Sequence, residues 1–158
     1  MTRRLTLVLA ALALVLPTAA IGASVGREEY VAGLEKICKP DSEATQRAVR
    51  GTRADVRSER FRRASTKVTK ASRIFAGTVR SIAEPPRPPS DRKTLARWFA
   101  ALQREGDALD RTAAALRAED LPRFQRVWAN FVHEGNKANN VVVSFGFDYC
   151  AFKPSRFM

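Results

Sequence analysis

The chain has 158 residues, of which 28 are Lys or Arg and 16 are Asp or Glu, so its formal charge is +12. An apolar content of 45% excludes a wholly disordered polypeptide, and the length allows one domain with a single core. A protein this basic is attracted to polyanions, although its charge says nothing about its fold.

Residues 1–23 have the parts of a secretory signal peptide. Two arginines precede the apolar stretch 5–16, and small residues then offer cleavage sites after Ala20 and Ala23. The alternative is an uncleaved membrane anchor over 5–25, which contains no charged residue. In both cases we expect an extracytoplasmic protein, either secreted or held at the cell surface.

Residues 24–158 would form one mature domain, with 26 basic and 16 acidic residues and a formal charge of +10. Cys38 and Cys150 are its only cysteines. Disulfides persist outside the cytoplasm, so we predict that this pair joins the two ends of the domain. The alternative is a pair of free, reactive thiols.

The first predicted helix begins near Arg27. Its apolar residues recur at spacings of four and three, as in Tyr30, Leu34 and Ile37. Pro40 disfavours helical geometry in the preceding residue, which predicts a kink or a break there. Gly51 is a suitable left-handed residue to end the helix.

A second helix is predicted over 52–83. Its apolar stripe consists of Phe61, Val68, Phe75, Val79 and Ile82. The opposite side, which we call the basic face, carries six candidate anion-binding residues: Arg62, Arg63, Lys67, Lys70, Arg73 and Arg80. This face is either the solvated back of a helix or a docking strip for an anionic surface. The strip has no interleaved aromatic residues to stack bases, so nucleic acid is the less favoured ligand.

The proline-rich segment 85–89 cannot be helical and predicts a stiff connector. Ser90 or Asp91 then offers an N-cap for the third helix. Asp120 similarly caps the fourth helix, after a turn over 117–120. The two helices have regular apolar stripes: Leu95, Trp98, Phe99, Leu102, Gly106, Leu109, Ala113 and Leu116 in the third, and Leu121, Phe124, Val127, Trp128, Phe131, Ala138, Val142 and Phe145 in the fourth.

Gly146 is expected to end the fourth helix. Gly106 and Gly135 lie at similar distances before and after the turn at 117–120, so an antiparallel hairpin would place them at one level. Glycine in a helix interior costs about 1 kcal/mol relative to alanine. We expect these two glycines to let the helix backbones approach closely, or to make room for a neighbouring indole.

Together these elements predict an all-α fold, an up-down-up-down four-helix bundle with its first helix kinked near Pro40 and one disulfide closing it. This topology returns the fourth helix to the end where the first begins, as a bond between Cys38 and Cys150 requires.

Motifs for catalysis are absent from the sequence. The single histidine, His133, falls opposite the apolar stripe and is expected to face solvent, and Lys137 stands where H-E-x-x-H needs its second histidine. Di-iron spacing, C-x-x-C-H and glycine-rich phosphate loops do not occur, so we expect no enzyme, metal or cofactor. Asn136 and Asn140 should face water, whereas Asn139 lies at the stripe edge and could hydrogen-bond to another helix or contact a ligand.

The leader, the segment Ile37-Cys38, the proline-rich midpoint and the ending 139–150 resemble small exported helical proteins of GC-rich actinobacteria. That resemblance carries over no functional residues beyond Cys38 and Cys150. The chain differs from them by Pro40 and by the lack of a lipid-attachment cysteine.

Two functions therefore stay open. The first is non-catalytic binding of an anionic envelope polymer or phospholipid surface through the basic face. The second is a protein-interaction or structural module of the cell envelope that uses an apolar groove.

Overall fold

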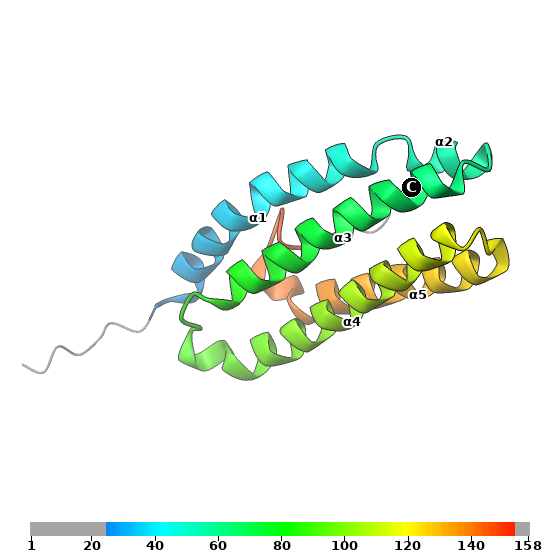
Figure 1. Cartoon of the computed structure of the whole chain (residues 1–158). Coiled ribbons are helices and arrows are strands. Elements are labelled where there is room, and N and C mark those ends of the chain that lie inside the picture. The colour runs from blue at the N-terminus through cyan, green and yellow to red at the C-terminus, as the bar shows by residue number, and fades with distance from the viewer. Residues whose placement is uncertain (1–24, 154–158) are drawn as a thin grey trace, which may run out of the picture.

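The computed structural model describes residues 25–153 and confirms the predicted all-α bundle with a disulfide between Cys38 and Cys150 (Figure 1). Its α-helices are α1 (Arg27–Val49), α2 (Thr52–Arg57), α3 (Phe61–Ala83), α4 (Arg92–Arg117) and α5 (Leu121–Val141). Two short 3-10 helices are η1 (Pro89–Asp91) and η2 (Val143–Phe145). The predicted leader, 1–23, lies outside the described residues.

Helix α1 runs through Pro40 without a break, so of the two alternatives only a bend is compatible with the structure. Figure 1 shows the helix changing direction along its length, as expected where a proline cannot donate to the preceding turn. Gly51 adopts the predicted left-handed conformation, with φ of 75°, directly after the helix.

The predicted helix over 52–83 is wrong as a single element, because it is interrupted at 58–60. Glu59 adopts a φ of 55°, and the amide of Arg60 donates to the carbonyl of Asp55 at 2.8 Å. This is the hydrogen-bond pattern of a Schellman motif, which ends α2 and reverses the chain into α3. The fourth predicted helix also ends early, at Val141, and η2 then leads to a left-handed Gly146.

The helices pack in the order α1, α3, α4 and α5, with α2 against α3. The core includes wholly buried Trp98 and Phe131. The side between α1 and α5 is closed by the segment 145–153, which we call the tail. Its Phe147 is buried and stacks on Trp98, with ring centroids 5.2 Å apart.

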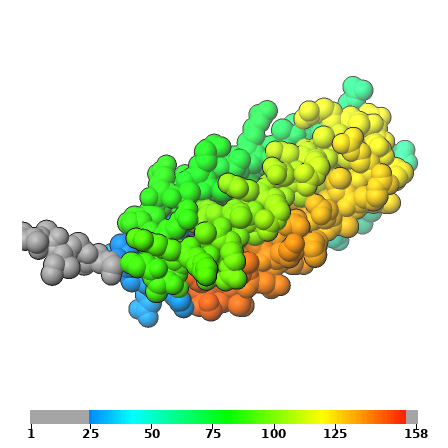
Figure 2. Space-filling model, turned by 90° about the horizontal axis from the view of Figure 1, so that it is seen from below, coloured from blue at the N-terminus to red at the C-terminus, as the bar shows by residue number. Residues whose placement is uncertain are grey.

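Several attachments hold the tail. Cys150 is bonded to Cys38 of α1, and the Glu35 carboxylate accepts hydrogen bonds of 3.1–3.2 Å from the amides of Asp148, Tyr149 and Cys150. Figure 2 shows the start of α1 at one end of the elongated molecule, with the orange segment that follows α5 beside it.

Asp91 occupies the predicted N-cap position of α4, but its side chain does not cap the helix. It accepts hydrogen bonds from Arg27 at 2.5 and 2.9 Å instead, tying the start of α4 to the start of α1. The hydrogen bond from Arg27 lowers the pKa of the Asp91 carboxyl below its ordinary value. Asp120 does cap α5 as predicted, accepting from the amide of Arg123 at 2.9 Å.

The glycine prediction is corrected at Gly106. A Cβ at this position would lie 3.3 Å from Cε1 of Phe75 in α3, and it would meet no atom of α5 within 4 Å. Gly106 therefore makes room for a phenyl ring on α3, and not for an indole or for the backbone of α5.

Candidate functional site

Packing of α3 divides the basic face into two groups and leaves Arg80 apart from both. Arg63 and Lys67 turn toward α2, where the Lys67 ammonium lies 2.5 Å from the buried carboxylate of Asp55 and 2.8 Å from the carbonyl of Arg50. Arg60 also donates to Asp55, at 2.9 Å. These partners, Lys67 first, lower the pKa of Asp55. Two of the six residues of the expected anion-binding strip, Arg63 and Lys67, therefore serve to fix the corner between α2 and α3.

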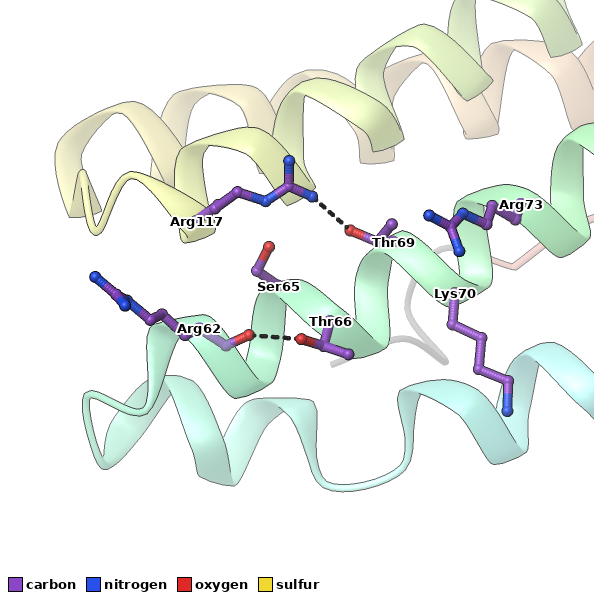
Figure 3. A pocket seen from close by; sticks show the side chains of 7 residues that line it. All are labelled: Arg62, Ser65, Thr66, Thr69, Lys70, Arg73 and Arg117. Carbon is purple, nitrogen blue, oxygen red and sulfur yellow. Dashed lines mark hydrogen bonds between the residues drawn. The ribbon is translucent and has the colours of Figure 1, made fainter.

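The second group lies beside α4 in an open hollow of about 730 Å³, which we call the basic hollow (Figure 3). Seven residues line it: Arg62, Ser65, Thr66, Thr69, Lys70, Arg73 and Arg117.

Hydroxyl groups separate the cations of this hollow. Arg117 reaches over from α4 and donates to the hydroxyl of Thr69 at 3.3 Å, while Arg73 lies one turn further along α3 (Figure 3). Lys70 extends from the other side of α3, toward α1. Ser65 donates to the carbonyl of Ala113 at 2.9 Å, which fixes the floor between the helices.

The balance of charge in the hollow is positive. Arg62 pairs with Glu119 at 3.0 Å, but both side chains are exposed, so the pair contributes little stability. Within 25–153, neither Lys70 nor Arg73 has a carboxylate at salt-bridge distance. A guanidinium with neighbouring hydroxyls can hold a phosphate or carboxylate in two-pronged hydrogen bonds.

Arg80, the last residue of the basic face, lines a different hollow of about 260 Å³. Phe75, Val79 and Leu102 contribute apolar surface to it, and Asp107 and Asp110 lie on its edge. We call this cavity the Phe75 hollow.

Residues that bear on catalysis are scattered. His133 is exposed, as predicted, and no group of three or more potential metal ligands is found in the described part of the chain. The sequence analysis missed Glu105, which is wholly buried on α4 with neither carboxyl oxygen hydrogen-bonded. Burial raises its pKa to about 8, and the charge of Glu134 adds to this effect.

Asn136 and Asn140 are exposed, as expected, and Asn139 is partly buried. Asn139 donates to the carbonyl of Phe152 at 2.6 Å, so its partner is the tail and not another helix.

Arg117 and Asp55 also escaped prediction. Arg117 was placed in a turn, yet it is the last residue of α4, and the antiparallel pairing of α3 with α4 brings it beside the start of α3. A signal for Arg117 was available: if α3 and α4 are antiparallel, the start of α3 with Arg62 and the end of α4 with Arg117 must lie close together. For Asp55 there was none, because an unbroken helix would hold it far from Lys67.

No protein-family model matches the chain, and neither a curated protein nor a solved structure matches it. In the part of the chain that the structure describes, no helix is both long and apolar enough to cross a membrane.

Proposed function

We propose that this protein is a non-catalytic, exported helical bundle that binds a phosphate-bearing component of the cell envelope through the basic hollow. The observation that carries the proposal is that Arg73 and Arg117 line one hollow together with hydroxyl groups, while Lys70 adds a cation on the side of α3 that faces α1 (Figure 3). No carboxylate pairs with Lys70 or Arg73 among residues 25–153. The disulfide is consistent with an oxidising compartment outside the cytoplasm.

The alternative, an apolar interaction groove, has less in its favour. Leu121 and Val143 are the large apolar side chains that are exposed in the described part of the bundle. They lie at the start of α5 and in η2, at different places in the fold, so they form no continuous patch of the kind that marks protein interfaces.

The test measures binding of the disulfide-bonded protein to vesicles of phosphatidylglycerol and, separately, to soluble poly(glycerol phosphate). Binding should fall steeply as salt rises, since the contacts are ionic. The double variant Lys70→Glu/Arg73→Glu should bind at least tenfold more weakly. The matched control is Arg123→Glu/Arg126→Glu, which makes the same change of charge on α5.

Equal losses in the two double variants would overturn the proposal, because they would show that net charge alone attracts the ligand. The two probes distinguish a lipid headgroup from a wall polymer. If a single-stranded oligonucleotide bound more tightly than both probes, and its binding depended equally on Lys70 and Arg73, the ligand would be nucleic acid and the envelope proposal would be wrong.

A further inference from the structure

The Phe75 hollow lies where α4 presents a glycine, Gly106, to Phe75 of α3. A Cβ at Gly106 would come within 3.3 Å of the Phe75 ring, and Gly106 itself lines the hollow. A glycine in a helix interior lowers helix stability, so a larger residue would favour the helix but narrow the space above the ring. The hollow is thus bounded by an aromatic ring and by the apolar side chains Val79 and Leu102.

The Phe75 hollow is lined by two carboxylates, whereas the described residues that line the basic hollow include four cations and no carboxylate. Asp107 and Asp110 are both exposed on α4, and Asp110 accepts a hydrogen bond from Ser72 of α3. Among residues 25–153, Arg80 is the one cation that lines the hollow. Phe75 is only 4% exposed and contributes apolar surface, so the exposed carboxylates of Asp107 and Asp110 are the groups that suit an organic ammonium, through ionic hydrogen bonds.

The two hollows follow one another along the seam between α3 and α4. Thr69 meets Arg117, Ser72 meets Asp110 one turn later, and Phe75 lies against Gly106 after a further turn. Ser72 lines the Phe75 hollow, while Arg73, the next residue, lines the basic hollow. At 1.5 Å per residue, the levels of Thr69 and Ala76 are roughly 10 Å apart along α3.

We infer that the seam binds a single ligand that carries both charges, a phosphate in the basic hollow and a primary ammonium on a short apolar chain in the Phe75 hollow. This inference rests on the proposed function, because the same basic hollow holds the phosphate. The ligand class is an aminoalkyl phosphate whose chain is long enough to reach from one hollow to the other, as in an amine-bearing polyol phosphate.

The test compares 5-aminopentyl phosphate with pentyl phosphate by calorimetric or NMR titration of the disulfide-bonded protein. Wild-type protein should bind the amine about tenfold more tightly, although pentyl phosphate is the more hydrophobic compound. The variant Asp107→Asn/Asp110→Asn changes two exposed residues and should abolish this preference without weakening pentyl phosphate. Removing two negative charges elsewhere, in Glu28→Gln/Glu29→Gln, should leave the preference unchanged.

Gly106→Ala is a second, independent variant. It should weaken binding of 5-aminopentyl phosphate by narrowing the Phe75 hollow, while inorganic phosphate, which needs only the basic hollow, should bind as it does to the wild type. Equal affinity of the wild type for 5-aminopentyl phosphate and pentyl phosphate would overturn the inference and leave the proposed function standing. Failure of both phosphates to bind would overturn the two together.

Discussion

The carboxyl group of Glu105 lies inside the bundle with no hydrogen-bond partner on either oxygen. An ionised carboxylate is strongly disfavoured in such a place, so burial raises its pKa from 4.5 to about 8. Below pH 4.5 the group is protonated in both the folded and the unfolded chain. Between pH 4.5 and 8 only the unfolded chain ionises, and the free energy of unfolding therefore falls as pH rises.

The variant Glu105→Gln removes this ionisation. Its stability relative to the wild type should grow by about 1.4 kcal/mol per pH unit across this window, reaching on the order of 4 kcal/mol at pH 8. Urea denaturation of both proteins at pH 4, 6 and 8 measures the effect. Glu105→Leu also removes the unpaired polar atoms and should exceed Glu105→Gln in stability at each pH. A stability difference that does not vary with pH would contradict this assignment.

Two glutamates end helices in a conformation that ordinarily requires glycine. Glu59 and Glu119 have φ values of 55° and 56°. Glu119 pairs with Arg62, whereas Glu59 is exposed, with no ion pair found within 25–153. A left-handed conformation costs an L-residue roughly 1–2 kcal/mol.

Glu59→Gly should therefore stabilise the protein, by about 0.5–1 kcal/mol after the extra flexibility of glycine in the unfolded chain is subtracted. The measurement is the shift of the urea midpoint at constant slope. Glu59→Ala is the control, because it removes the same side chain but keeps the strained φ, and it should give no gain. A gain of equal size in both variants would attribute the effect to charge and not to the backbone.

These residues show where prediction from sequence stops. Glu105 follows Leu102 by three residues and precedes Leu109 by four, so it falls on the apolar stripe, and this spacing was a signal of burial. The end of α2 gave no such signal. Its left-handed residue is Glu59, where the usual indicator is glycine or asparagine.

At the scale of elements, apolar periodicity predicted the long helices well, because each buries one stripe against its neighbours. Local capping chemistry predicted where α4 and α5 begin, and it predicted the capping hydrogen bond of Asp120, whose side chain has no ion pair within 25–153, but not the partner of the Asp91 side chain. Asp91 binds Arg27, 64 residues away in the chain. A distant cation competes with capping only after the helices have packed, so the outcome depends on tertiary structure.

For the tail, the sequence predicted one contact, the disulfide from Cys150 to Cys38, and not the hydrogen bonds to Glu35. Three consecutive amides at 148–150 donate to the Glu35 carboxylate, and hydrogen bonds to a charged acceptor are stronger than neutral ones. Glu35→Gln should accelerate hydrogen exchange at these amides by roughly tenfold while the disulfide stays intact. The control is Glu29→Gln on the exposed side of α1. Unchanged exchange in Glu35→Gln would show that the disulfide alone orders the tail.

At the scale of the molecule, the sequence predicted the charge and the topology, but not how the charge is distributed. The cations of α3 share one side of the helix in the sequence pattern. In the folded protein, however, Lys67 pairs with Asp55 next to α2, whereas Arg73 lines a hollow with Arg117 of α4. The hollows arise from pairs of helices, so no single-helix wheel contains them. Gly106 illustrates this, since its neighbour across the seam, Phe75, comes from another helix.

Covalent closure of the bundle joins residues 112 positions apart, and it ties α1 to the tail, which is also hydrogen-bonded to α5 through Asn139. In the chain-entropy account, a loop of this length contributes roughly 4–5 kcal/mol by restricting the unfolded chain. That is a large share of the 5–15 kcal/mol, roughly, that stabilises an ordinary domain.

Cys38→Ala/Cys150→Ala should therefore lose about 4 kcal/mol of unfolding free energy, measured by urea denaturation. It should remain helical by circular dichroism, because Glu35, Asn139 and Phe152 still hold the tail. Dithiothreitol should lower the midpoint of the wild type toward that of the variant, whereas the variant, which has no thiols, serves as the control and should not respond. A wild type whose midpoint is the same with and without reductant would contradict the view that the disulfide stabilises the bundle.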